Sequence, residues 1–443
     1  MYLIFSSKIF FSNKLILPIT IFFLFSIFSF ILSYTSSDLN TTIILVTLSS
    51  VICLISYFKV TDNLLLKPSI LYALSVLLFI LARPIINLIG DIEIVSVGNG
   101  INDKNILRTL SVILLSLSIT SISYSAGCLK ESFFYDRKYL YVRQPILNNF
   151  LYYSFLILGC IFLYNSYLGS QLIGKSSYFD LINDENHFSH LKYFFLAKII
   201  CLLWLLNADI KYNNFLRASF LLFFFSIGFL IIGLRGYFIS YLFLYLFFLN
   251  IKYKFNIIYL LVGALVLLLG SSYILEYRLG FSVYHDWIDM VIQPFYDQGA
   301  TFEVVFGSVI FSNEISRCMP LFDYLLKTIP FGGCVDSSRG VPFVDGGFAS
   351  SFFAEAYYLS IFIYVILSVL IGYFLKFLDQ ASCYIKKDLM NELTFALSFI
   401  LFIIIPNLIY FGRASAFDFI LKFTEGIIFL ILFFKNNKKY TYL

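Results

Sequence analysis

Apolar runs of about twenty residues recur along the whole chain, and this feature most narrows the folds open to it. A run of that length is what a helix needs to cross the hydrocarbon core of a bilayer. Charged residues make up 13% of the 443 residues and hydrophobic residues 60%, whereas soluble domains carry about 25% charged residues. The sequence therefore predicts an all-α, polytopic membrane protein.

We predict about twelve transmembrane helices. The segment Gly233-Leu234-Arg235-Gly236 divides an apolar stretch too long for one helix, so the seventh and eighth spans should form a tight hairpin. The first apolar run is followed by no small-residue cleavage pattern and is expected to remain as a helix. The predicted spans cover residues 15–33, 42–58, 69–89, 106–128, 147–165, 193–210, 215–232, 236–250, 255–275, 349–375, 393–411 and 415–434.

The distribution of basic residues tests this topology. With the N-terminus inside, the inner segments hold 18 Lys and Arg residues and the outer segments hold 9. Four of the 9 lie in one long outer loop, where the positive-inside rule is weak. Both termini are therefore expected on the cytoplasmic side. The net charge of +5 is small and the basic residues lie at helix ends, so no nucleic-acid partner is indicated.

Three regions follow from the spans: residues 1–275 with the first nine helices, a large outer loop over 276–350, and residues 351–443 with the last three helices. The loop holds most of the polar groups that could perform chemistry. Near-helical spacing over 282–297 and a short apolar run over 300–311 predict a partly helical cap over the outer leaflet. Gln293-Pro294 and Asp297-Gln298-Gly299 are predicted breaks.

Four arginines are predicted on the outer face, where the positive-inside rule disfavours them: Arg235, Arg278, Arg339 and Arg413. An arginine at a tight turn can bind two phosphate oxygens with its forked guanidinium. The alternative is a charge at a helix end that only faces water or lipid headgroups.

Glu355 lies about two turns into the predicted tenth span. A carboxylate within a span is costly, and it is by default a candidate functional residue. The alternative is a structural ion pair with an arginine.

The cysteines favour no metal cluster, because the seven of them include no C-x-x-C pair. His187 and His190 lack the i, i+4 spacing of a zinc-binding helix. Cys318 and Cys334 both fall in the outer loop. If that face is oxidising, they are expected to form a disulfide; the alternative is two free thiols.

Three short segments carry a resemblance to a known family. They are Gly233-Leu234-Arg235-Gly236, the run Phe295-Tyr296-Asp297-Gln298-Gly299-Ala300-Thr301, and residues 346–357, which read GGFASSFFAEAY. With the many spans and the one dominant outer loop, the chain resembles the O-antigen polymerases, the Wzy-type oligosaccharide repeat-unit polymerases of bacterial inner membranes.

The resemblance implies glycan transfer at the periplasmic face of the inner membrane. The growing chain, held by undecaprenyl pyrophosphate, would move onto a sugar hydroxyl of a new lipid-linked repeat unit. Implied partners are this lipid-linked oligosaccharide, the membrane lipids and, as a candidate, a chain-length regulator protein. No nucleotide sugar, metal or other cofactor is expected.

This reaction assigns roles to the candidate residues. Negative charge develops on the pyrophosphate leaving group, and arginines can stabilise it; Arg278 and Arg339 are the first candidates, with Arg235 and Arg413 in reserve. The attacking hydroxyl needs a base. Glu355 is the first candidate for that base, followed by the loop residues Asp286, Asp289 and His285.

Rival functions remain at this point. A lipid-linked oligosaccharide flippase has a similar number of spans but usually carries its charges within the helices. An O-antigen ligase shares the architecture and relies on a histidine in its large outer loop; His285 is the only one here and lacks the expected flanking pattern. A secondary transporter would show a pair of broken helices in corresponding halves, which the sequence lacks.

Overall fold

The structure is a computed structural model of the whole chain. It describes the residues 13–35, 39–59, 66–90, 94–95, 102–126, 145–173, 191–232, 234–253, 270, 276, 287–310, 351–385, 392–412, 424 and 428.

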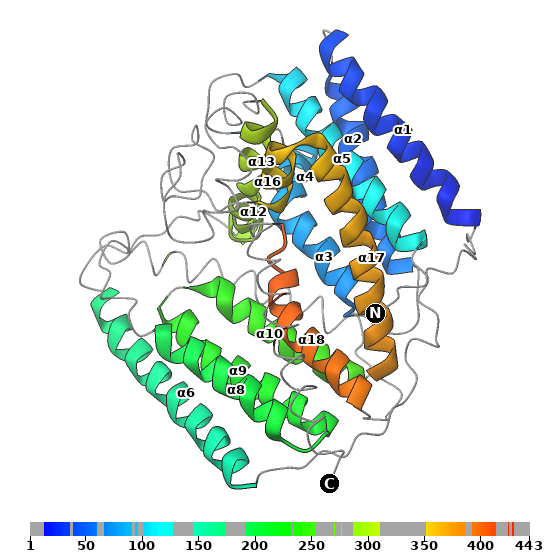
Figure 1. The fold of residues 1–443 in the computed structure, drawn as a ribbon. Coiled ribbons are helices and arrows are strands. Elements are labelled where there is room, and N and C mark those ends of the chain that lie inside the picture. Colours follow the sequence, from blue (N-terminus) through cyan, green and yellow to red (C-terminus); the bar gives the residue numbers. More distant parts are fainter. Residues whose placement is uncertain are drawn as a thin grey trace.

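Most of the described residues lie in helices, and no strand occurs among the described residues (Figure 1). The predicted all-α membrane class is confirmed. The helices are α1 (Asn13–Thr35), α2 (Asn40–Lys59), α3 (Pro68–Val76), the π-helix η1 (Leu77–Leu81), α4 (Ala82–Gly90), α5 (Asp103–Ala126), α6 (Pro145–Ile173), α8 (Leu191–Asn207), α9 (Tyr212–Ile231), α10 (Arg235–Lys252), α12 (Trp287–Gln298), α13 (Thr301–Ile310), α16 (Phe352–Leu359), α17 (Ile361–Ile385) and α18 (Glu392–Leu408).

Five helical stretches within the described ranges are long and apolar enough to cross a membrane by length and composition. They are Pro68–Leu88, Asp103–Ala126, Pro145–Ser170, Tyr212–Ile231 and Ile361–Ile385. Shorter apolar helices accompany them, and the outward surfaces of α1 and α6 are rich in exposed large apolar side chains. Such surfaces suit contact with lipid tails.

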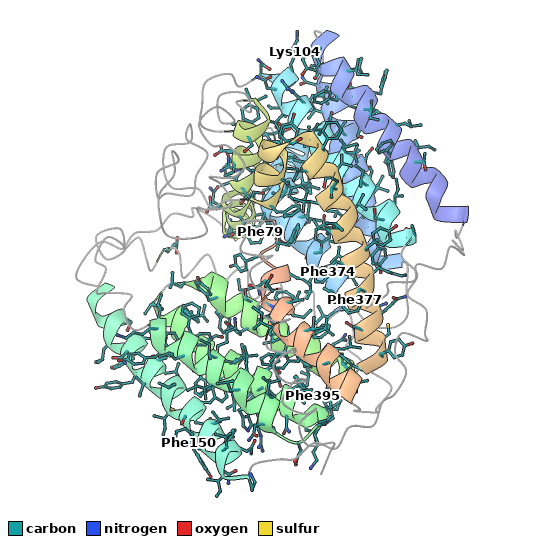
Figure 2. The ribbon with its side chains drawn as sticks, viewed as in Figure 1. Phe79, Lys104, Phe150, Phe374, Phe377 and Phe395 are labelled. Atoms are coloured by element: carbon teal, nitrogen blue, oxygen red, sulfur yellow. The ribbon has the colours of Figure 1, made fainter. Side chains whose placement is uncertain are left out.

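Two groups of helices are visible in Figure 1. One contains α1 to α5, α12, α13, α16 and α17; the other contains α6, α8, α9 and α10. Helix α18 lies between them and packs against α9 and α10 on one side and against α3 and α17 on the other. Figure 2 shows Phe374 and Phe377 on the side of α17 that faces α18. Both side chains pack against the buried apolar core.

Helix α5 is the centre of the first group, and small residues let its neighbour approach closely. Some of its buried hydroxyls donate to carbonyls one turn earlier, as Ser118 Oγ does to Leu114 O at 2.7 Å, whereas Thr120 Oγ1 donates to the Ser368 carbonyl of α17 at 3.2 Å. A Cβ at Gly372 of α17 would overlap the main-chain oxygen of Thr120 in α5. The two helices therefore meet backbone to backbone, the type of contact that small residues permit in membranes.

The π-helix η1 interrupts the third span just before Arg83-Pro84. Proline has no N–H to donate, and its ring would clash with the carbonyl four residues earlier in a regular α-helix. For Pro84 that carbonyl belongs to Ile80, within η1. We attribute the wider turn to this local conflict, and π-helical turns often accompany functional sites.

Two boundaries differ from the sequence prediction. The predicted span over 349–375 is wrong in extent, because extended backbone at Ser360 (φ 177°, ψ 149°) separates the short α16 from α17, which continues to Ile385. The predicted break at Gln293-Pro294 is also wrong, since α12 runs through Pro294 to Gln298. The break at Gly299 is confirmed. The predicted spans over 255–275 and 415–434 fall almost wholly outside the described residues.

Candidate functional site

A buried ion pair joins the third span to the corner between α12 and α13. Arg83, at the start of α4, is 6% exposed, and its guanidinium pairs with the carboxylate of Glu303, which is 1% exposed. Arg83 Nε also donates to the carbonyl oxygen of Tyr296 at 3.0 Å. The guanidinium carbon lies 4.2 Å from the centre of the Tyr296 ring, in cation–π geometry. One arginine thus binds a charge, a carbonyl and an aromatic face.

Gly299 allows this contact to form. A Cβ at this position would lie 2.9 Å from the main-chain nitrogen of Arg83 and 2.8 Å from its Cγ. The Gly299 N–H closes α12 on the carbonyl of Phe295 at 2.9 Å, and α13 starts two residues later. Among the described residues of the predicted outer loop, the 295–301 segment therefore packs onto Arg83 together with Glu303.

Arg83 and the role of Glu303 did not emerge from the sequence. In the sequence, Glu303 is one of several carboxylates within residues 276–350, and Arg83 lies inside the predicted span over 69–89. The available signal was an arginine within an otherwise apolar run, which is itself a candidate functional residue.

The end of α18 forms a second junction close to the same region. The Gly412 N–H donates to Ser75 Oγ at 2.8 Å, and Ser351 Oγ donates to the Gly412 carbonyl at 3.0 Å. All three residues are buried. These bonds join the chain after α18 to α3 and to the residue that precedes α16.

Tyr410 joins α10 to this junction. A Cβ at Gly236 would overlap the Tyr410 hydroxyl, so the start of α10 lies directly against that side chain. The Tyr410 ring lies 5.3 Å from the ring of Phe79 in η1. Figure 2 shows Phe79 where the two groups of helices meet.

Three of the predicted site residues can be placed by their backbone. Arg235 is the first residue of α10, next to Gly236. Glu355 lies in α16, one turn after Ser351, and this short helix packs against α13 and α17. Asp289 lies in the first turn of α12. The other predicted site residues fall outside the parts that the structure describes: Arg278, His285, Asp286, Cys318, Cys334, Arg339 and Arg413.

A second buried polar cluster lies at the opposite end of the third span. Asp379 of α17 accepts the Ser69 N–H at 3.0 Å and the hydroxyls of Ser69 and Tyr124 at 2.6 Å each. Lys67, 1% exposed, lies within electrostatic range of this carboxylate. Ser69 and Arg83 are 14 residues apart, or about 20 Å along a helix. We call Ser69, Tyr124 and Asp379 the Asp379 cluster.

The Asp379 cluster has the form of a helix cap supplied by another helix. Ser69 lies in the first turn of α3, where main-chain N–H groups lack partners within their own helix. Negative charge is also favourable at this end of a helix. No metal site emerges from the described residues, since no three of their His, Cys, Asp and Glu side chains gather in one place.

The fold and these contacts define a polytopic, all-α membrane protein with a buried ion pair towards one end of its third span and a main-chain junction near the middle of that span. A sequence model of the family described as O-antigen polysaccharide polymerase Wzy matches residues 18–322. An O-antigen polymerase from Escherichia coli is 34% identical over a 431-residue alignment, and the match covers 93% of this chain and 93% of the relative. No solved structure matches significantly. The chain belongs to the O-antigen polysaccharide polymerase Wzy family, and the family predicted from the three motifs is confirmed.

Proposed function

We propose that this protein polymerises O-antigen repeat units carried on undecaprenyl pyrophosphate at the periplasmic face of a bacterial inner membrane. Membership of the Wzy family supports the polymerisation itself. The observation that carries the site is the meeting of three elements: Gly236 touches Tyr410, and Gly412 is bonded to Ser351. Candidate residues lie immediately beside these contacts.

The contacts at the other end of the third span support the predicted orientation of the helices. The topology predicted from basic residues puts Ser69, Tyr124 and Asp379 near the inner ends of three different spans. Ser69 and Tyr124 both donate hydrogen bonds to Asp379, which agrees with that relative orientation. With Lys67 and Lys376 beside this cluster, the positive-inside rule assigns it to the cytoplasmic side. The ion pair then lies towards the periplasmic side, and the Gly412 junction lies between the two, since Ser75 is about midway between Ser69 and Arg83.

We assign the pyrophosphate to the arginines beside these contacts. Arg235 precedes the Gly236 contact with Tyr410 by one residue, and Arg413 comes directly after Gly412 in the chain. This neighbourhood favours the two as a pair, with Arg278 and Arg339 as further ligands from the loop. Their forked guanidinium groups would bind the phosphate oxygens and stabilise the negative charge of the leaving group.

We assign the base to Glu355. In the proposed step its carboxylate takes the proton from the acceptor sugar hydroxyl, and the oxygen attacks the anomeric carbon of the donor. A glycosidic bond forms, the bond from that carbon to pyrophosphate breaks, and undecaprenyl pyrophosphate leaves. Support comes from the position of α16, whose preceding residue Ser351 is bonded to the residue before Arg413. Asp286, Asp289 and His285 are the alternative bases, and a chain-length regulator remains a predicted partner.

Deletion of the gene in its host tests the polymerase function. A polymerase deletion should leave a single repeat unit on the lipopolysaccharide, whereas loss of a flippase or a ligase would leave none. Complementation then tests the residues: Arg235→Lys, Arg413→Lys and Glu355→Gln should fail to restore the ladder of long chains at normal protein level. Arg217→Lys, on an exposed face of α9, is the matched control and should restore it. Full ladders from both arginine variants would refute the pyrophosphate assignment.

A further inference from the structure

We propose that Arg83 and Glu303 act as positioning residues: their ion pair fixes α13, and α13 in turn fixes α16 and its Glu355. This inference rests on the proposed role of Glu355 as the base. It adds two residues that would act on the reaction without contacting the substrate. They are 220 positions apart in the sequence.

The first step is that Arg83 makes several contacts with the turn between α12 and α13. Its guanidinium binds the Glu303 carboxylate, the Tyr296 carbonyl and the Tyr296 ring, while its main chain lies against Gly299. A lysine offers one compact charge in place of the planar, forked group and cannot make these contacts together. The corner between α12 and α13 is therefore fixed by arginine in particular.

The second step is the packing of α13. Nine of its ten residues are buried, from Thr301 to Val309, and the helix packs against α5, η1 and α16. A buried helix in a close-packed interior cannot shift alone, since its neighbours must move with it. The position that Arg83 imposes on Glu303 is thus passed to α16.

The third step is that α16 is too short to be stable without its neighbours. It has eight residues, far fewer than an isolated helix needs, and it is followed by extended backbone at Ser360. Its described attachments include its packing on α13 and α17, the contacts of the Phe352 and Phe353 rings with Phe411, and the bond from Ser351 to Gly412. A change in α13 should therefore displace Glu355 relative to the junction at Gly412.

A purely stabilising role does not explain the pair. Replacing a buried ion pair by apolar residues of similar volume is often neutral or stabilising, because both charges lose their hydration. With Arg83 6% exposed and Glu303 1% exposed, neither group faces the solvent where a substrate sugar would lie. Precise placement of a neighbouring group accounts for the pair better than either binding or stability.

The test uses the purified full-length protein with lipid-linked repeat units extracted from the polymerase-deleted host. Arg83→Lys and the double variant Arg83→Met/Glu303→Leu should lower kcat at least tenfold, with KM changed less than twofold. The double variant should melt within a few degrees of the wild type, and Arg217→Lys should match the wild type throughout. Wild-type kcat in Arg83→Lys would overturn the inference, as would an equal rise in KM or a loss explained by unfolding.

A double-mutant cycle separates this inference from the proposed base. Residues that act as one unit are not additive, so Arg83→Lys should reduce kcat much less in a Glu355→Asp background than in the wild type. Additive losses would overturn the positioning role and leave the base assignment standing. If Glu355→Gln turns over normally, the base assignment itself is wrong, whatever Arg83→Lys does.

Discussion

Replacing Asp379 by alanine should destabilise the protein more than any other single loss in the Asp379 cluster. The carboxylate accepts three hydrogen bonds, from the Ser69 N–H, the Ser69 hydroxyl and the Tyr124 hydroxyl. Each buried donor that loses its acceptor costs about 1–3 kcal/mol. The buried Lys67 also loses the negative charge near it, and breaking a buried pair of charges costs about 3–5 kcal/mol.

These contributions overlap, because hydroxyls can turn towards other acceptors and a lysine can reach for water. We therefore expect Asp379→Ala to cost about 3–5 kcal/mol in total. Tyr124→Phe removes one donor together with its need for an acceptor, and should cost about 1 kcal/mol. Tyr373→Phe, on the exposed side of α17, should cost nothing measurable.

Thermal unfolding of the detergent-purified variants measures this order. The Tm should fall by on the order of 5 °C or more for Asp379→Ala, by a small amount for Tyr124→Phe and not at all for Tyr373→Phe. A Tm for Asp379→Ala equal to that of the wild type would refute the reasoning. So would a larger loss from Tyr124→Phe, since the tyrosine supplies only one of the three bonds.

Further measurements address packing, topology and the outer loop. Gly372→Ala should lower the Tm because its Cβ would overlap main-chain atoms of α5, whereas Gly270→Ala meets no atom within 4 Å and should leave the Tm unchanged; equal Tm values would contradict the close contact. A reporter fused near Asp323 should read periplasmic, and a cytoplasmic signal there would reverse the proposed orientation. Cys318 and Cys334 should resist thiol labelling until a reductant is added, since a disulfide closing a loop of about 16 residues contributes roughly 3 kcal/mol; full labelling without reductant would leave them as free thiols.

The helices that could be predicted are those whose signal is local. Apolar runs of membrane length gave α1, α2, α5 and α9 to within a few residues, because a helix is the structure that satisfies every backbone group in lipid. The break at Ser360 was not predicted, because it has no such local signal. It lies in a continuous apolar run with no Pro or Gly beside it, so the break between α16 and α17 depends on packing that local sequence does not encode.

In the candidate site, too, local motifs could be predicted and long-range contacts could not. The 295–301 and 346–357 segments were recognisable, because a family resemblance can be read from short motifs. The contact between Arg83 and Glu303 could not be predicted, since the two residues are 220 positions apart and only the tertiary fold brings them together. Polar residues within an apolar span mark such partners, but the sequence does not say which carboxylate an arginine will meet.

The third span carries Ser69 at one end and Arg83 near the other, and its π-helix η1 affects the angle between these residues around the helix axis. Asp379 fixes the first turn of this span, Ser75 binds Gly412 midway, and Arg83 binds Glu303 near its far end. Each residue added to or removed from a helix rotates all later residues of that helix by about 100° around its axis. A π-helix closes hydrogen bonds five residues apart where an α-helix closes them four apart, so η1 alters the angle around the helix axis between Ser75 and Arg83. The local conflict at Pro84 thus sets the register in which the buried arginine can reach α13, and through α13 the helix that carries Glu355.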